Sequence, residues 1–459
     1  MGFWRPSRRR LATGLAAALT LLGSAAVAAP HHRPASLRPP APTFASYPIP
    51  DSLGSANNSG EPSVGVDWRS GAVLYQAGFA TYRLKLTDGT WTDVSSPYTG
   101  FNIDPILVTD PWSGVTLAGG DDGSCSILAV TTDDGDNWQP SLPCSFTPDH
   151  PTVGIGPAVG TSRQANKRVV YFCQQYPWVN ECAASTDDGT TWLPAVPVQG
   201  GCIGPSGHVK VSADGTAYLP IRACNDDGSE ASLTSGAHVG GAVSLDNGRT
   251  WNSYRIPGAV WPTHGFDPSV ATTPDNTVYE SWPRYGDYLP MVASSKDHTK
   301  TWSRPVDISH GSGFPIYAST FETVVAGDDG RVAVAYLGAD RPPEPGTTVF
   351  DPGYVGAWYL YASYTYDAGA HWVTTRIQQA PVQLGPICDV GTRCLSGRNL
   401  LDFMDASFTS DGRLVVGYAN GCAGGCPADP AAVAQSVNAW GVVAVQKSGM
   451  SLFGRFGSF

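Results

Sequence analysis

The sequence predicts an all-β protein in which one small antiparallel sheet is repeated around an axis. The predicted fold is a seven-bladed β-propeller, with a six-bladed propeller as the alternative. Two segments, one turn-like and one strand-like, each recur along the chain, and no stretch shows a sustained helical period. The 53 Gly and 38 Pro among 459 residues, with only 15% charged residues, suit many short strands and turns.

The first repeat is an eight-residue turn, Ser-x-Asp-x-Gly-x-Thr-Trp. Two copies match it in full, at residues 185–192 and 244–251, and looser copies are at 131–138, 295–302 and 365–372, with a shortened copy at 87–91. Asp and Gly favour a tight turn between strands, the Ser/Thr and Asp side chains bond the turn backbone, and Trp fills the gap between sheets. The repeat is therefore interpreted as scaffold and not as a catalytic site.

The second repeat opens the first strand of each blade. Its copies begin at Glu61, Asp104, Asp149, Gly204, Asp267, Phe321 and Met404. Most copies are followed by a second β-rich run, and the turn repeat then ends a third strand, so each copy predicts one blade. Seven starts predict seven blades in a single domain at residues 51–459. The longest interval, from Glu322 to Asp405, predicts an insertion.

The turn repeat resembles the Asp-box, or BNR repeat, of the sialidase superfamily and other β-propellers. This resemblance covers nearly the whole mature chain and implies a secreted bacterial propeller whose site lies on the face where the inner strands begin. Sialidases use three Arg residues to hold a substrate carboxylate, a Tyr–Glu nucleophile pair and an Asp acid/base. Tyr254-Arg255-Ile256-Pro257 resembles the motif that carries the first of those Arg residues. It follows the fourth turn repeat directly, so Arg255 is predicted to lie on an outer strand instead.

The N-terminus predicts export. Arg5, Arg8, Arg9 and Arg10 precede an apolar run from Leu11 to Val27, and Ala26-Val27-Ala28 fits a cleavage site. Residues 1–28 are therefore predicted to be a signal peptide that resembles a bacterial twin-arginine signal. Residues 29–50 are predicted to be a Pro-rich, disordered leader.

Ten cysteines fit an exported chain. Their spacing predicts five disulfides between neighbours: Cys125–Cys144, Cys173–Cys182, Cys202–Cys224, Cys388–Cys394 and Cys422–Cys426. The alternative is a thiolate metal site made by the last four of these sulfurs.

The net charge of the mature chain disfavours some classes of binding partner. Residues 1–28 contain four Arg and no acid, so the mature chain has 24 basic against 39 acidic residues. This balance argues against nucleic acid and anionic membrane as partners and leaves a glycan substrate and a monomeric chain as the expectation. No cofactor is expected to be required, although calcium would suit a cluster of carboxylates.

The residues that open the inner strands should converge in one funnel. The catalytic candidates among them are Asp149, His150, His208, Asp267, Glu322 and Asp405, and Glu61 and Asp104 belong to the same ring. Crowded carboxylates and imidazoles shift one another's pKa, which acid/base chemistry uses. For any one of these positions, the competing interpretation is a structural bond to the backbone of the next blade.

Arginines at the ends of second strands should lie on the same face. The candidates for substrate binding are Arg222, Arg284 and Arg341, together with Arg398, which precedes the seventh strand start, and Tyr285. Arg binds carboxylates through two parallel hydrogen bonds, so such a set suits an anionic sugar.

Three functions remain open at this stage. The first is a sialidase-like glycoside hydrolase that acts on an anionic glycan. The second is a polysaccharide lyase on a uronate-containing glycan, with His150, His208 or His264 as the base. The third is a non-catalytic binding or assembly propeller, because one fold supports many functions.

Overall fold

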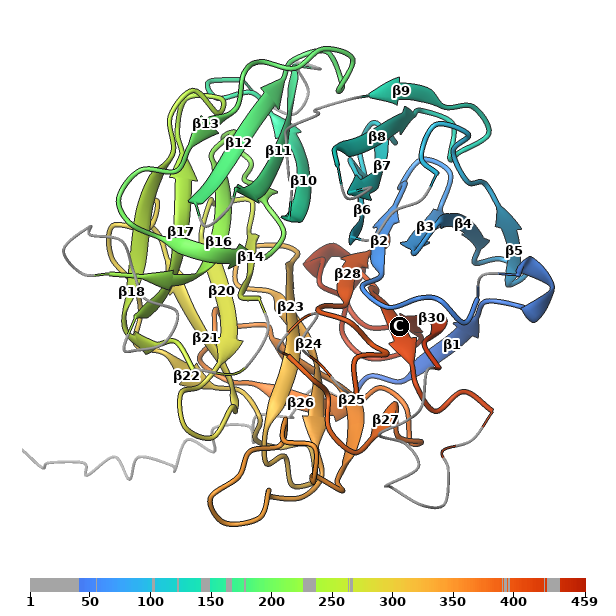
Figure 1. The fold of residues 1–459 in the computed structure, drawn as a ribbon, viewed down its shortest axis with the longest axis vertical. Helices are drawn as coiled ribbons and strands as arrows, with labels where there is room; N and C mark the ends of the chain where they lie inside the picture. Colours follow the sequence, from blue (N-terminus) through green and yellow to red (C-terminus); the bar gives the residue numbers. More distant parts are fainter. Residues whose placement is uncertain are drawn as a thin grey trace, which may run out of the picture. The chain divides into compact units, whose positions relative to one another are not determined.

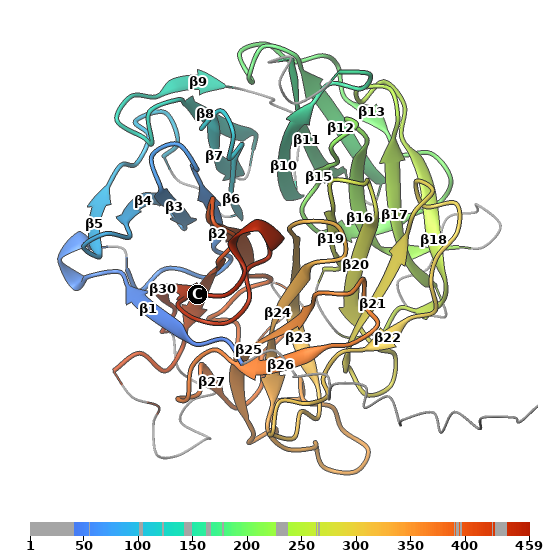
Figure 2. The ribbon, with the colours of Figure 1, turned by 180° about the vertical axis from the view of Figure 1, so that it is seen from behind.

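The computed structural model describes residues 41–459, except residues 55, 101–103, 122–123, 142–148, 162–166, 177–178, 226–236, 263, 265–266, 390, 392–393, 395–396, 425 and 427–437. Pro39–Phe459 form one compact unit built of antiparallel strands (Figure 1, Figure 2). Two short 3-10 helices lie near its ends, at Asp51–Leu53 and Gly454–Phe456. Within the described residues, no helix has the length and apolarity needed to cross a membrane.

The strands fall into consecutive sets along the chain. The first set is β2 (Ser63–Val66), β3 (Ala72–Ala77), β4 (Ala80–Lys85) and β5 (Thr90–Asp93). The second is β6 (Asp104–Thr109), β7 (Thr116–Asp121), β8 (Ser126–Thr131) and β9 (Gln139–Ser141). The third is β10 (Asp149–Pro157), β11 (Arg168–Tyr176), β12 (Val179–Ser185) and β13 (Val196–Pro197). The fourth is β14 (Ile203–Ser206), β15 (Lys210–Val211), β16 (Ala217–Cys224), β17 (His238–Ser244) and β18 (Asn252–Val260).

The remaining sets follow the same order. The fifth is β19 (Ser269–Thr272), β20 (Val278–Pro283), β21 (Pro290–Ser295) and β22 (Val306–Asp307). The sixth is β23 (Ser319–Ala326), β24 (Val332–Ala339), β25 (Ala357–Thr365), β26 (Val373–Arg376) and β27 (Gln383–Leu384). The last is β28 (Asp405–Phe408), β29 (Leu414–Asn420) and β30 (Trp440–Gln446), to which β1 (Phe44–Pro48) is added.

The inner strands form a closed ring. β2, β6, β10, β15, β19, β23 and β28 each contact the next, and β28 contacts β2. The predicted all-β propeller is therefore confirmed. The hydrogen-bonded sheets of the described strands number six, because Val179 of β12 pairs with Ile203 of β14 and joins two sets into one nine-stranded sheet. In its described residues, the predicted insertion before Asp405 contains the short strand β27, which pairs with β25.

The first strand of the unit closes its last sheet. β1 pairs with β30 in a register that runs from Phe44 opposite Gln446 to Pro48 opposite Val442 (Figure 1). The predicted leader of residues 29–50 is therefore wrong at its C-terminal end. The Pro-rich composition gave no local signal for β1, because its partner β30 lies near the other end of the chain. The predicted signal peptide lies outside the described residues.

The turn repeats act as scaffold. In the fourth set, Asp246 accepts hydrogen bonds from the Ser244 hydroxyl (3.0 Å), the Thr250 N–H (2.9 Å) and the Thr250 hydroxyl (2.7 Å). Gly248, at φ 78°, donates its N–H to the Ser244 oxygen at 2.9 Å. The same pattern ties Asp187 to Ser185 and Thr191. These local bonds complete the turn without any ligand.

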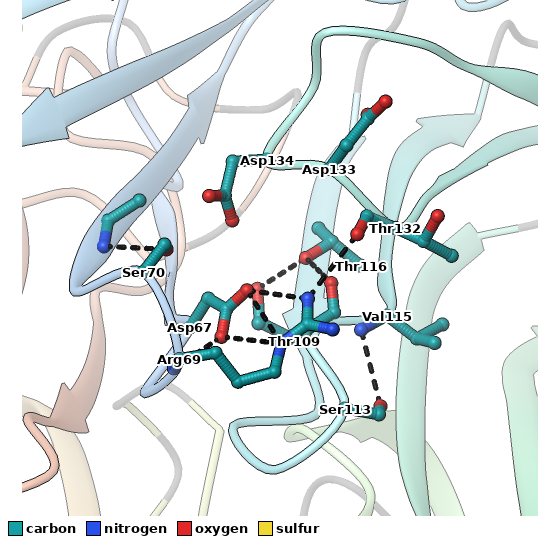
Figure 3. A network of polar contacts seen from close by, with 12 residues as sticks. Asp67, Arg69, Ser70, Thr109, Ser113, Val115, Thr116, Thr132, Asp133 and Asp134 are labelled. Carbon is teal, nitrogen blue, oxygen red and sulfur yellow. Dashed lines mark hydrogen bonds and ion pairs between the residues drawn. The ribbon is translucent and has the colours of Figure 1, made fainter.

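Turns of one set also bond to the next set. Figure 3 shows the junction of the first two sets, where the carboxylate of Asp67 accepts hydrogen bonds from Arg69. Arg69 in turn reaches the carbonyl of Thr132, which lies in the turn repeat of the second set, at 3.3 Å. The Trp of the repeat adds another link, since Trp138 Nε1 donates to the Val94 carbonyl at 2.8 Å.

Four of the predicted disulfides are present: Cys173–Cys182, Cys202–Cys224, Cys388–Cys394 and Cys422–Cys426. The fifth predicted pair includes Cys144, which lies outside the described residues. Because the last two bonds use the sulfurs proposed for a thiolate metal site, that alternative is wrong. Four disulfides are typical of a protein that folds in an oxidising compartment.

Candidate functional site

Four side chains occupy one equivalent position where the inner strands begin. Glu61, Asp104, His150 and Asp267 are each followed by Pro at the start of a strand that contacts its neighbours in the ring. Glu61 and His150 have positive φ angles of 54° and 50°. This backbone conformation is strained for a non-Gly residue, and such strain is concentrated at functional sites. The common position explains why residues far apart in sequence meet at this end of the ring.

His150 lies at the centre of this group. Its Nδ1 lies 3.3 Å from Asp267 Oδ2, and its Nε2 lies 3.8 Å from Asp402 Oδ2. Its backbone N–H donates to Asp104 Oδ2 at 3.4 Å. The imidazole of His150 therefore contacts two carboxylates and its backbone contacts a third, and these come from the second set, the fifth set and the loop before β28. We call Glu61, Asp104, His150, Arg222, Asp267, Arg398 and Asp402 the strand-start cluster.

Two arginines complete the strand-start cluster. Arg222, near the end of β16, donates from Nε to Asp267 Oδ1 at 2.9 Å and lies 5.9 Å from the ring centroid of Trp261. Arg398 forms a two-point ion pair with Asp402, and its Nη2 lies 3.8 Å from Glu61 Oε1. The loop that carries Arg398 is tied to the first set, because the Glu61 N–H donates to the Leu400 carbonyl at 3.2 Å.

Two carboxyls of the strand-start cluster favour the neutral form. Burial, together with the charges of Asp402 and Asp104, raises the pKa of Glu61 well above its usual value, and Arg398 opposes this only in part. Burial is also the main cause that raises the pKa of Asp104; His150 opposes it, while Asp149 and Asp402 add to it. Both shifts favour the neutral form of the carboxyl, which can donate a proton.

Three other groups favour the charged form. Burial works to raise the pKa of Asp402, but the hydrogen bonds and charge of Arg398, helped by His150 and Arg222, lower it to about 2. Arg222 and His150 likewise lower the pKa of Asp267 against the effect of burial. Burial works to lower the pKa of His150, but the charge and hydrogen bond of Asp267 outweigh it and raise the pKa to about 9. Carboxyls whose pKa values are shifted in opposite directions therefore share one cluster.

His208 and Asp405 lie one layer deeper along the ring. The Val64 N–H donates to Asp405 Oδ2 at 3.1 Å, as the Val209 N–H donates to the Thr152 hydroxyl and the Val324 N–H donates to the Ser269 hydroxyl. Asp405 thus has the position of Thr152 and Ser269, two residues beyond His150 and Asp267. His208 Nδ1 lies 3.4 Å from Asp405 Oδ1. Asp405 thus joins His208 to the backbone of β2, and these contacts are separate from those of the strand-start cluster.

Glu322 is also placed apart from the strand-start cluster. Its carboxyl accepts a hydrogen bond from the Ser319 hydroxyl, and its other oxygen is buried without a hydrogen-bond partner. Burial raises its pKa to about 7, and the Ser319 hydrogen bond opposes this in part. Asp149 is exposed and acts on the cluster through its charge, which raises the pKa of Asp104.

Three of the predicted binding residues do not contact the strand-start cluster. Arg284 pairs with Asp287 at 2.6 Å and Asp307 at 3.3 Å, within its own strand set. Tyr285 is 60% exposed, and the Arg341 side chain is 56% exposed beside Asp340. The prediction placed these residues at strand ends, but Arg284 and Arg341 lie beside acids of their own sets and Tyr285 is exposed. Arg255 lies on β18, the outer strand of its set, as predicted.

Asp402 is the site residue that the sequence did not reveal. It lies in the loop before β28 and is followed by Phe and Met, not by the Pro that marks the other acids. The one sequence signal for Asp402 is its place four residues after Arg398. Side chains of opposite charge at this spacing can form an ion pair within one loop. Within the described residues, no group of three or more His, Cys, Asp or Glu side chains has the arrangement of a metal site.

The fold and this site define the class of protein: an all-β propeller with a polar, partly buried cluster where the inner strands begin. Comparison with family models and with curated proteins gives no match. Several solved structures are similar. A protein of unknown function from Dyadobacter fermentans is 14% identical, with 89% of this chain and 98% of that chain covered and a TM-score of 0.44.

Two other solved structures are similar to a comparable degree. The Hadza microbial sialidase Hz136 is 14% identical, with 82% of this chain and 73% of that chain covered and a TM-score of 0.43. YCF48 from Cyanidioschyzon merolae is 13% identical, with 88% and 98% covered and a TM-score of 0.45. Since identities and scores are low, the description of fold and site rests on this chain's own strands and contacts.

Proposed function

We propose that this chain is a secreted, carbohydrate-active protein whose strand-start cluster works as a sialidase-like glycoside hydrolase site for an anionic glycan. The observation that carries the proposal is a group of carboxyls around His150 whose pKa values are shifted in opposite directions. Asp104 has a raised pKa, and the nearby Asp402 has a pKa lowered to about 2. Hydrolysis of a glycosidic bond uses such a pair, one carboxyl as acid and one carboxylate as base or nucleophile.

Asp104 suits the acid role because its side chain is only partly buried, whereas Glu61 is 3% exposed. Asp402 suits the role of the carboxylate, because Arg398 and His150 hold it ionised. Glu61 would then remain neutral beside Asp402 and limit the negative charge at the site.

The charges of the strand-start cluster favour an anionic substrate. Arg222, Arg398 and His150 supply three cations, while Asp267 and Asp402 are the two carboxyls held ionised. While Glu61 and Asp104 are neutral, the cluster carries one positive charge in excess. A sugar carboxylate would neutralise that charge and accept hydrogen bonds from the guanidinium groups.

The lyase alternative is less well supported. A lyase needs a neutral imidazole to remove a proton, but the pKa of about 9 keeps His150 charged at neutral pH. His264 lies 3.3 Å from Asp389, and the hydrogen bond from that carboxyl raises its pKa as well.

The test is an assay of the purified protein on sialylated, uronate-containing and neutral glycans. We expect release of a saturated sugar from an anionic glycan, and a loss of at least about 100-fold in Asp104→Asn, because general acid catalysis contributes that much. Asp287→Asn is the matched control, since Asp287 pairs with Arg284 outside the cluster. An ultraviolet-absorbing product would identify a lyase, and the absence of any product would favour a binding propeller.

We further infer export by the twin-arginine route, with cleavage near Ala28, and a monomeric mature protein. The four disulfides support an extracellular or periplasmic location. Mass spectrometry of the unreduced protein should give a chain starting near residue 29 with all ten cysteines oxidised. No cofactor is needed for the proposed reaction, and activity that is lost in a chelator and restored by calcium would add that ion to it.

A further inference from the structure

A second polar and aromatic site lies at the other end of the ring, where the inner strands finish. A cavity of about 440 Å³ is lined by the last residues of six inner strands: Thr109 of β6, Pro157 of β10, Val211 of β15, Thr272 of β19, Ala326 of β23 and Phe408 of β28. The strand-start cluster lies at the opposite ends of these strands, so the two sites occupy opposite faces. We call this space the strand-end cavity. Its volume falls within the roughly 300–1,000 Å³ of small-molecule pockets.

The walls of the strand-end cavity are mostly apolar. Val108, Ile155, Val211, Val324 and Ala406 come from successive inner strands and present aliphatic surface to the space. Such a surface binds the apolar body of a ligand through the hydrophobic effect.

Aromatic rings gather at one side of the cavity. Trp68 lies 4.7 Å from Trp112, 5.6 Å from Phe408 and 5.4 Å from Phe453 between ring centroids. Trp68 is held in place because its Nε1 donates to the Phe408 carbonyl at 2.8 Å. Trp112 is 53% exposed, which is unusual for so large an apolar side chain. Because Trp112 is exposed and packs on the fixed ring of Trp68, it can contact a planar or branched apolar group of a ligand.

Three cations line this apolar space, Lys210, Arg168 and Arg455, and the Arg455 guanidinium lies 4.7 Å from the ring centroid of Phe456. Lys210 of β15 lines the cavity, its side chain is 30% exposed, and its Nζ lies 3.9 Å from Asp405 Oδ1, beyond hydrogen-bond distance. An ammonium group has three N–H donors, so the ion pair with Asp405 leaves Lys210 able to donate to a further acceptor. The other charged groups at the cavity are better satisfied. Arg168 bonds Asp188 at 3.0 and 3.1 Å, Asp110 accepts from the Ser113 hydroxyl, and Asp328 accepts from the Gly454 N–H.

We propose that the strand-end cavity binds a small carboxylic acid with an aromatic or branched apolar body. The ligand carboxylate accepts hydrogen bonds from the Lys210 ammonium, and the apolar body lies between the aliphatic walls and Trp112. This site does not depend on the glycosidase function proposed for the opposite face.

The test is isothermal titration calorimetry of the full mature protein with 3-phenylpropionate and, as a neutral probe of the same shape, 3-phenylpropionamide. We expect the carboxylate to bind about tenfold more tightly than the amide, which is the size of one charge-assisted hydrogen bond. Lys210→Gln should remove that preference and leave the affinity for the amide unchanged. Lys300→Gln, an exposed lysine in a turn repeat, should leave both affinities unchanged.

Trp112→Ala tests the apolar contact separately, and its exposed position makes misfolding no concern. It should weaken both probes by a similar factor of about three to ten. Absence of binding by the wild-type protein at millimolar 3-phenylpropionate would overturn the proposal. Equal affinities for the two probes, or an unchanged affinity for the carboxylate in a folded Lys210→Gln variant, would overturn the role of Lys210.

Discussion

The Nδ1 atom of His150 lies 3.3 Å from the Oδ2 atom of Asp267, and the two residues occupy the same position in their own strand sets. Each stands directly before a Pro at the start of an inner strand. Closure of the ring of inner strands brings these equivalent positions together. The repeat that opens the inner strands therefore also assembles the ion pair between His150 and Asp267.

The first prediction concerns the charge on His150. Replacing Asp267 by Asn removes the main group that raises the pKa of His150, so this pKa should fall from about 9 toward its ordinary value of 6.5. A pH titration of the His150 ring signals by NMR would measure it. Asp287→Asn should leave the titration unchanged, because Asp287 pairs with Arg284 in another part of the fold. A pKa that stays near 9 in Asp267→Asn would contradict the assignment.

The second prediction concerns Glu322 and the dependence of stability on pH. Its pKa is raised from 4.5 to about 7 in the folded chain, so the unfolded chain releases its proton first as the pH rises. The stability that Glu322 contributes is present below about pH 4.5 and is lost as the pH rises through 7. Compared with Glu322→Gln, the wild-type protein should therefore become less stable over this range, by at most about 3 kcal/mol.

Denaturant unfolding of both proteins from pH 4 to pH 8 measures this difference. Glu344→Gln is a matched control, because Glu344 is exposed. A constant difference between wild type and Glu322→Gln across the range would contradict the raised pKa.

The third prediction concerns the turn repeat. Asp246→Ala removes three hydrogen bonds to Ser244 and Thr250, and the free energy of unfolding should fall by about 1–3 kcal/mol. Leu245→Ala in the same turn should have little effect, since Leu245 is 51% exposed. Thermal unfolding of the two variants gives the comparison. Equal melting temperatures would mean that the turn does not need its Asp.

The fourth prediction concerns closure of the ring. A chain that starts at residue 41 keeps β1, whereas a chain that starts at residue 49 leaves β30 without its outer strand. The shorter chain should unfold at a lower temperature and aggregate, because β30 then has an unpaired edge. Light scattering during thermal unfolding would detect both effects. Similar behaviour of the two chains would show that β1 is dispensable.

Features with local causes could be predicted from the sequence alone. The turn repeats formed as expected, because Asp246 and Ser244 bond atoms only a few residues away. The four disulfides also joined sequence neighbours, such as Cys388 and Cys394. For the site, the acids and His that stand before Pro were recognisable, because Glu61, Asp104, His150 and Asp267 share one position relative to an inner strand.

Features that depend on distant parts of the chain were decided by the tertiary structure. β1 was missed because its partner is the last strand, and its Pro-rich surroundings gave no local signal. Asp402 was missed because a loop, and not the repeat, brings it to His150 and Arg398. Asp405 was placed with the site because an acid opens its strand, but it lies two residues deeper and bonds the Val64 backbone. The local sequence determines turns and strand register, whereas ring closure and loop packing determine which side chains meet.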